Sequence, residues 1–135
     1  METVTIHQSI LVPAKANQIY EIMMHAEKHA DLTSDDAIIE DTVGSAFSFF
    51  SGYITGTNVE LSYGKRIVQL WQAKEDVWPT THFSIVIFDL IDKGNSTLIE
   101  FTQEQLPKQV EKTIYDGWYD YYWNPMLELF ADMNL

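Results

Sequence analysis

The chain has 135 residues, of which 46% are hydrophobic and 13% aromatic, so it is long enough to build one folded domain around its own core. Its 8 basic and 20 acidic side chains give a formal net charge of −12, which argues against a nucleic-acid or anionic-membrane partner because phosphate groups would repel it. The lack of cysteine excludes disulfides, thiol catalysis and thiolate metal sites.

Targeting and membrane-spanning patterns are not found. The first residues, Met1 to Thr5, lack the basic stretch and apolar run of a secretory signal. No apolar run approaches the roughly 18 residues that a membrane-spanning helix needs. We therefore expect a cytoplasmic protein.

The first part of the chain predicts a strand followed by helix. Residues 3–12 alternate weakly between apolar and polar types, which indicates a strand, and Pro13 suits the first turn of a helix. From residue 14 to about residue 25, apolar side chains recur at the i, i+3, i+4 and i+7 positions of one helical face. Residues 26–33 predict a second short helix or an irregular turn.

The middle of the chain is rich in β-type sequence. Residues 33–36 are typical of a turn, because Thr, Ser and Asp side chains bond their own backbone. Residues 92–95 predict a hairpin turn, and Trp78-Pro79 predicts a loop. The strands predicted between and around these turns cover residues 37–40, 45–50, 52–61, 65–73, 81–91 and 96–104.

Alternation in the last two predicted strands assigns their faces. One face carries Val86, Phe88, Leu90, Ile99, Phe101 and Gln103. We expect this face to point towards the C-terminal helix, which leaves Phe83, Ile85 and Ile87 on the outer face. Three interpretations of this apolar patch are open. It is an interface with another protein, it is covered by the N-terminal strand or a loop, or it pairs with a second copy of the chain.

The last 28 residues, 108–135, predict a long amphipathic helix with a broad buried face. Its apolar side chains recur every four residues at Val110, Ile114, Trp118, Tyr122 and Met126, and Tyr121, Leu129, Phe130 and Met133 widen the stripe. Pro125 predicts a kink or a break, or else a new helix with Asn124 as its N-cap. In that interpretation residues 108–123 grip the sheet and residues 126–133 close one end of any cavity.

These elements together predict an α+β fold and a single domain over residues 1–135. The expected order is a strand, two short helices, about six antiparallel strands and a long helix. In this arrangement a curved antiparallel sheet of six to seven strands wraps around the C-terminal helix.

Several motifs occurring in order resemble one family. They are the run from Gly52 to Trp71, with Lys65-Arg66-Ile67-Val68, then Trp78-Pro79, His82-Phe83-Ser84, Gly117-Trp118 and Tyr121-Tyr122-Trp123-Asn124-Pro125. From Ile6 onward the chain resembles the activators of the heat-shock protein 90 ATPase, within the START-like helix-grip superfamily. The likeness is to the carboxy-terminal domain of the eukaryotic activator and to single-domain relatives.

The resemblance implies a helix-grip fold and a non-catalytic, cochaperone-like binding role, with a heat-shock protein 90 type chaperone as partner. The domain principally associated with ATPase stimulation in the eukaryotic activator lies outside the resemblance. An alternative function is a carrier or sensor that binds a small hydrophobic ligand between sheet and helix. A third is a cyclase- or hydrolase-like enzyme, because some helix-grip relatives have such activities.

The helical aromatics are the candidate lining of a ligand cavity. Large rings that meet across a curved sheet leave voids, and the alternative is a packed core. Gln103, polar on an apolar face, is the candidate group that orients a ligand. The candidate cavity residues are Phe49, Ile54, Trp71, Val86, Phe88, Phe101, Gln103, Trp118, Tyr122 and Met126.

Metal binding and catalysis find little support. His25 and His29 have a spacing that would place two imidazoles on one helical face, but Ala26 stands where a zinc-protease motif needs Glu. We therefore interpret this segment, with Glu27 and Asp31, as a polar helix end, and expect no metal and no cofactor. No nucleophile elbow or phosphate loop is found, so we expect no catalytic residues. Monomer and homodimer both remain open.

Overall fold

A computed structural model describes residues 1–133, with side chains to residue 131. The chain begins with β1 (Thr3–Val12), α1 (Ala16–Met24) and α2 (Ala26–Thr33). The strands that follow are β2 (Ala37–Ile38), β3 (Ala46–Phe49), β4 (Ile54–Ser62), β5 (Arg66–Ala73), β6 (Ser84–Asp92) and β7 (Thr97–Pro107). The C-terminal helix consists of η1 (Lys108–Val110), α3 (Glu111–Trp118), the π-helical turn η2 (Tyr119–Trp123) and α4 (Asn124–Met133).

The described part of the chain forms one seven-stranded antiparallel sheet in the order β1-β7-β6-β5-β4-β3-β2. From β2 to β7 each strand pairs with the next in sequence, and β1 then adds to the free edge of β7. Two register shifts, between Val4 and Ile6 and between Asn58 and Glu60, interrupt the ladders. Such bulges bend and twist a strand. The predicted α+β fold is confirmed, although β2 is shorter than expected.

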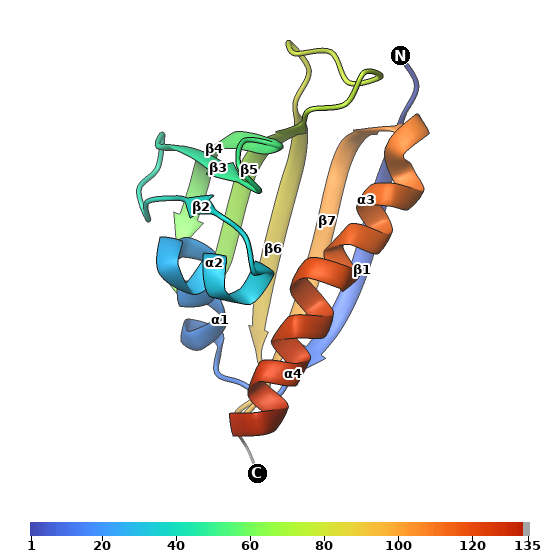
Figure 1. Cartoon of the computed structure of the whole chain (residues 1–135). Helices are drawn as coiled ribbons and strands as arrows, with labels where there is room; N and C mark the ends of the chain where they lie inside the picture. The colour runs from blue at the N-terminus through green and yellow to red at the C-terminus, as the bar shows by residue number, and fades with distance from the viewer. Residues whose placement is uncertain (134–135) are drawn as a thin grey trace.

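The C-terminal helix runs across one face of the sheet beside β1, β6 and β7, while α1 and α2 lie to the side of the helix, next to β2 (Figure 1). The predicted inner face is confirmed, because Val86, Phe88, Ile99 and Phe101 are all buried. Phe101 packs on Trp118 with ring centroids 4.4 Å apart. The core therefore lies between this sheet face and the helix.

The helix is not broken at Pro125. Asn124 is helical and donates its backbone N–H to the carbonyl of Tyr119, five residues back, so it is not the N-cap of a new helix. A proline ring clashes with the carbonyl four residues earlier in an α-helix. The wider π turn just before Pro125 gives that ring room, so the chain continues directly into α4.

The π turn also corrects the predicted buried stripe. Residues four apart advance about 40° around an α-helix with each step, so a four-residue stripe drifts off one face unless a wider turn compensates. Here the turn brings Tyr122 and Trp123 inward together, and Trp123 is fully buried. Tyr121 and Leu129 are 50% and 40% exposed, so their predicted burial was wrong. The predicted place of the Met133 side chain lies outside the described residues.

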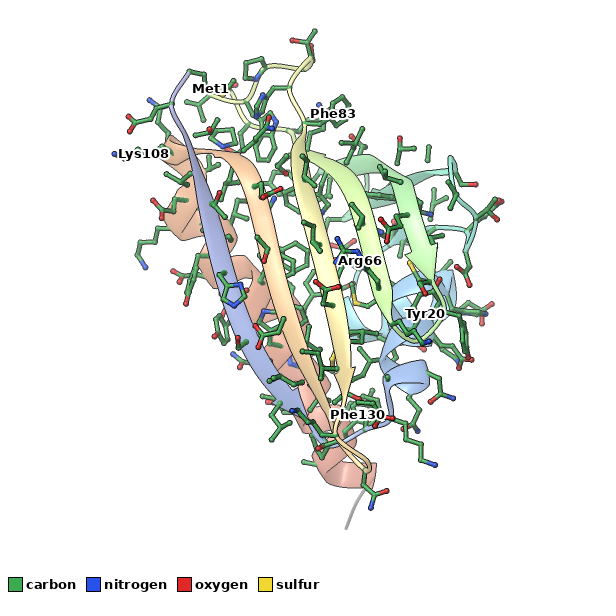
Figure 2. All side chains as sticks on the ribbon, turned by 180° about the vertical axis from the view of Figure 1, so that it is seen from behind. Met1, Tyr20, Arg66, Phe83, Lys108 and Phe130 are labelled. Carbon is green, nitrogen blue, oxygen red and sulfur yellow. The ribbon has the colours of Figure 1, made fainter. Side chains whose placement is uncertain are left out.

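No helix of residues 1–133 lies on the outer face of the sheet (Figure 2). Arg66 lies on this face and bridges Glu60, at 3.0 Å, and Asp89, at 2.5 Å. Ile85 and Ile87 are half-buried there. Coverage by the N-terminal strand was a wrong alternative, because β1 pairs with β7 at the sheet edge. Within residues 1–133, no helix has the length and apolar character needed to cross a membrane.

Candidate functional site

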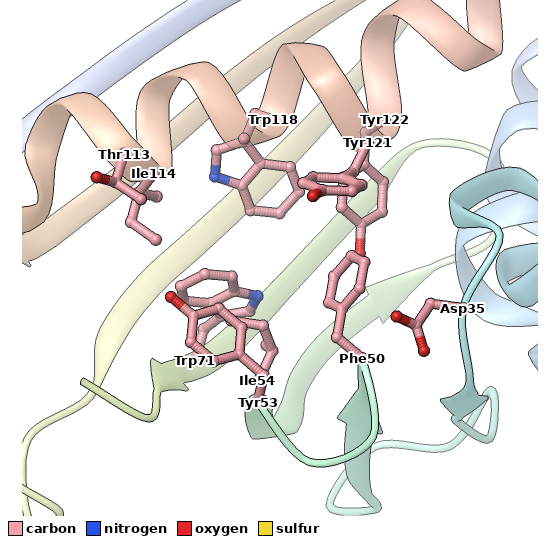
Figure 3. Close-up of a pocket in the computed structure, with 11 residues that line it drawn as sticks. Asp35, Phe50, Tyr53, Ile54, Trp71, Thr113, Ile114, Trp118, Tyr121 and Tyr122 are labelled. Carbon is pink, nitrogen blue, oxygen red and sulfur yellow. The ribbon is translucent and has the colours of Figure 1, made fainter.

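A partly open pocket of about 340 Å³ lies between the C-terminal helix and strands β4 and β5. Figure 3 shows side chains from both walls converging on it. Ligand pockets begin near 300 Å³, so the space suits a small molecule or one large side chain. The residues that line it are Asp35, Phe50, Tyr53, Ile54, Trp71, Thr113, Ile114, Gly117, Trp118, Tyr121 and Tyr122.

Two indole rings connect the sheet wall to the helix wall. Trp71 on β5 and Trp118 on α3 have ring centroids 5.7 Å apart. The Nε1–H of Trp118 donates to Oε1 of Gln103 at 2.9 Å, on the core side. Its polar atom is therefore satisfied inside the protein, and its contribution to the pocket is aromatic surface.

A left-handed turn places Phe50 at the pocket edge. Phe50 and Ser51 both have φ of 54°, and Gly52 follows with φ of 90°. This conformation is unfavourable for residues with a Cβ, so it persists only where the surroundings hold it. The Phe50 ring packs edge-on against Tyr121 across the pocket, with centroids 5.2 Å apart. The turn thus brings strand and helix walls into contact at the rim.

The Tyr53 hydroxyl on the strand side is already bonded to the protein. It donates to Oε2 of Glu75 at 2.5 Å. Burial, together with the hydrogen bond to this carboxylate, raises the pKa of Tyr53. The hydroxyl therefore stays protonated and is directed at Glu75.

Tyr122 ties the pocket to α2 through His29. The Nδ1 of His29 lies 2.9 Å from the carbonyl oxygen of Met23, which can only accept, so Nδ1 carries the proton. Nε2 must then accept from the Tyr122 hydroxyl at 2.8 Å. Burial lowers the pKa of His29 to about 4, partly opposed by the bond to Met23, and burial raises the pKa of Tyr122. A neutral imidazole and a protonated phenol result.

Among the described residues that line the pocket, Asp35 alone is charged. It follows α2, is exposed, and accepts the Asp36 backbone N–H at Oδ1, 2.7 Å away. Its carboxylate faces the gap between the two walls (Figure 3). The pocket therefore has a negative group at its edge and no basic group in its lining.

A glycine, Gly117, leaves the helix wall of the pocket without a side chain at one position. Thr113, Gly117 and Tyr121 are four residues apart and line the same side of the pocket. A Cβ built at Gly117 would have no neighbour within 4 Å. The missing side chain at this position therefore leaves space in the pocket rather than relieving a clash.

The structure brings part of the predicted cavity set to the pocket: Ile54, Trp71, Trp118 and Tyr122 line it. The other predicted residues pack in the core instead, namely Phe49, Val86, Phe88, Phe101, Gln103 and Met126. Gln103 does not orient a ligand here, since its Nε2 donates to Ser84 Oγ at 2.9 Å and its Oε1 accepts from Trp118. Residues 126–133 do not close this pocket, whose helix wall ends at Tyr122.

The histidine spacing does not form a metal site. His25 has extended backbone geometry between α1 and α2 and is exposed, whereas His29 is buried and stacks on Phe49 with centroids 4.0 Å apart. The two imidazoles therefore do not share a helical face. Within the described residues, no group of three or more His, Asp or Glu is placed to hold a metal.

The sequence prediction missed several lining residues, most of them in turns or on the exposed edge of the helix. The missed residues are Asp35, Phe50, Tyr53, Thr113, Ile114, Gly117 and Tyr121. Two patterns pointed to them: a Phe-Ser-Gly turn before β4, and a glycine within an aromatic helix. Neither pattern says which distant segment lies opposite.

The chain is similar to proteins of one known family. The model of the family "Activator of Hsp90 ATPase homolog 1-like protein" matches residues 13–131. The chain belongs to this family. Among its relatives, the human activator of 90 kDa heat shock protein ATPase homolog 1 is 26% identical over 84% of this chain. The activator homolog of Dictyostelium discoideum is 32% identical over 73% of the chain. These matches span only 33% and 26% of the relatives' lengths.

Solved structures of similar fold include one that is described as an HSP90 activator. A Plasmodium falciparum HSP90 activator superposes with a TM-score of 0.88 at 20% identity, covering 94% of this chain and 96% of that one. A protein of Chromobacterium violaceum gives 0.77 at 20% identity, covering 93% and 96%. At this identity the likeness shows the fold alone, and it confirms the helix-grip architecture.

Proposed function

We propose that this activator-family chain is a non-catalytic binding domain that contacts a heat-shock protein 90 type chaperone. The observation that carries the proposal is the family match over residues 13–131, together with relatives named as activators of that ATPase. The chain spans only about a third or less of the human and Dictyostelium relatives. Stimulation of the chaperone's ATPase is therefore proposed for this chain and is not taken over from those longer proteins.

The outer face of the sheet is the surface that we expect to make this contact. No helix of the described part of the chain covers it (Figure 2), and it presents apolar side chains, among them Leu70 at 37% exposure and Phe83 at 36%. Exposed apolar patches of this kind mark interfaces. Carboxylates at Glu60, Asp89 and Glu100 lie among them, and the net charge of −12 suits a basic surface on the chaperone.

The direct test is a calorimetric titration of the purified protein with the chaperone of the same organism, coupled to a measurement of the ATPase rate. We expect binding that weakens as salt is raised, because exposed charges are screened. Absence of binding at high micromolar concentration, with an unchanged ATPase rate, would contradict the proposal.

A matched pair of variants tests the surface. Leu70→Glu on the outer face is expected to weaken chaperone binding at least tenfold, as the loss of an interface apolar contact and burial of a charge would do. Leu129→Glu is the control, since Leu129 is similarly exposed, at 40%, but lies on the C-terminal helix. Equal effects of the two substitutions would exclude the outer face. Light scattering of the wild-type protein checks whether a second copy competes for the same surface.

A second candidate function is binding of a small hydrophobic ligand, supported by the 340 Å³ aromatic pocket. Native mass spectrometry and a thermal-shift screen with lipids and aromatic metabolites test it. Gly117→Leu should fill the pocket and remove any thermal shift while leaving chaperone binding unchanged. A shift that persists in Gly117→Leu would place the ligand elsewhere.

A further inference from the structure

The described lining of the pocket combines six aromatic side chains with a single carboxylate, and this combination favours a positively charged ligand. We propose that the pocket binds an organic cation, with an ammonium or guanidinium head among the ring faces beside Asp35 and an apolar body against the exposed surface of Trp71 and Trp118. The inference rests on the second candidate function, in which this pocket takes a ligand, and it names the class of that ligand.

The aromatic walls of the pocket favour a cation. Ring faces carry the negative end of a quadrupole, and cations within about 6 Å of a ring centroid are attracted to it. The hydroxyls of Tyr53 and Tyr122 are bonded to Glu75 and His29, so these residues offer the pocket ring surface rather than free donors. Trp118 likewise directs its N–H into the core, to Gln103. The described lining therefore offers an anion only the neutral N–H of Trp71 and the hydroxyls of Thr113 and Tyr121.

The Asp35 carboxylate at the pocket edge also favours a cation. Its Oδ1 accepts the neighbouring Asp36 N–H, and none of the ion pairs of the described side chains involves its carboxylate. No Lys or Arg lines the pocket, and the whole chain carries a net charge of −12. This field attracts cations and repels carboxylates and phosphates. Charge and ring faces thus select the same sign of ligand.

Gly117 shows that the space is not a by-product of poor packing between large rings. A glycine within a helix is unfavourable compared with alanine. At this position a Cβ would point into open space, not into a neighbour, so packing does not require glycine. What a side chain here would remove is pocket volume.

The test uses three probes that share one apolar body: phenylbutylamine, phenylbutanol and phenylbutyrate. Their affinities are measured by calorimetry and by quenching of tryptophan fluorescence, since Trp71 and Trp118 line the pocket. We expect the amine to bind about tenfold more tightly than the alcohol, and the carboxylate to bind most weakly. Added salt should weaken the amine and not the alcohol.

Asp35→Asn should reduce the affinity for the amine to that for the alcohol, while the alcohol binds unchanged. Asp36→Asn is the matched control, because it removes the same charge from the next residue, which does not line the pocket. Gly117→Leu should abolish binding of all three probes. An amine preference that survives Asp35→Asn, or a carboxylate that binds as tightly as the amine, overturns the proposal.

The same experiment separates this inference from the function on which it rests. If the three probes bind equally, the cation preference fails and the hydrophobic-ligand function stands. If no probe binds to the wild-type protein, both fail. A further measurement compares phenylbutylamine with Nα-acetyl-lysine amide, whose free side-chain ammonium group represents a lysine of a partner protein. Tighter binding of the lysine amide assigns the cation to a protein, and tighter binding of phenylbutylamine assigns it to a small molecule.

Discussion

The C-terminal helix meets the sheet in two ways along its length. In the closed half, Trp123 of the helix packs on Phe88 of β6 and Phe101 of β7, and all three rings have almost no exposed surface. In the open half, Trp71, Tyr121 and the other lining residues surround a pocket next to β4 and β5. Both halves are rich in aromatic side chains, so residue type does not distinguish a packed core from a pocket.

The two halves also differ in how their polar side chains are hydrogen-bonded. In the closed half, Gln8 accepts from Trp123 Nε1 at 2.8 Å and donates to the carbonyl of Tyr115 at 3.0 Å. Gln103 joins Trp118 to Ser84 in a similar way. Throughout the described side chains, every buried nitrogen or oxygen has a partner. The closed half is therefore complete without a ligand, whereas Asp35 in the open half faces solvent and the pocket.

The largest expected contrast between the halves is in stability. Trp123→Ala should lower the free energy of unfolding by about 3–5 kcal/mol, because it leaves a cavity in the closed half. Tyr121→Ala, at a half-exposed ring in the open half, should cost no more than about 1 kcal/mol. Urea unfolding followed by circular dichroism measures both. Similar losses would show that the two halves do not differ in packing.

The His29–Tyr122 contact beside the open half should make stability depend on pH. His29 has a pKa of about 4 in the folded protein, below its usual 6.5, so the unfolded state binds the extra proton between these values. Stability from this group is therefore complete above pH 6.5 and is lost as pH falls towards 4, by about 3 kcal/mol.

The measurement is urea unfolding across this pH range for the wild type and for His29→Gln. The variant lacks the titrating imidazole, so its stability should fall less steeply between pH 6.5 and 4. The difference between the two curves removes the contribution of the carboxylates that both proteins share. Parallel curves would mean that the His29 imidazole does not resist protonation.

Replacing a polar side chain by an apolar one should lower stability more in the closed half than in the open half, by less than the tryptophan substitution does. Gln103→Leu leaves the Trp118 N–H and the Ser84 hydroxyl without their present partner in the closed half, at a cost of about 1–3 kcal/mol. Thr113→Val in the open half changes an exposed hydroxyl and should alter stability by less than about 0.5 kcal/mol. Thermal unfolding of the two variants checks the order, and a neutral Gln103→Leu would refute the role given to this network.

One substitution in the open half is expected to raise stability. Gly117→Ala should raise the free energy of unfolding by about 1 kcal/mol, because alanine favours the helix and its Cβ meets open space. Gly56→Ala is the opposite control, since a Cβ there would lie 2.0 Å from the Leu70 carbonyl oxygen and should destabilise the sheet. A destabilised Gly117→Ala protein would mean that the open half is packed after all.

Prediction from the sequence succeeded where a pattern is local. The expected strand over residues 3–12 matches β1, and the helix expected from residue 14 to about residue 25 contains α1, because alternation and helical periodicity depend on near neighbours. It failed at Tyr121 and Trp123, where burial depends on the π turn before Pro125. A stripe with a period of four is compatible with several helical geometries, and only packing against the sheet selects one.

The sequence by itself determined the order of the elements, the inward face of the last two strands and the resemblance to the activator family. Tertiary structure alone decided which aromatic residues fill the core and which surround a pocket. Hydrophobic periodicity states which face of an element is turned from water, but not whether the surface opposite fills the space. That depends on Asp35, Phe50 and Gly117, which are far apart in sequence and meet only in the fold.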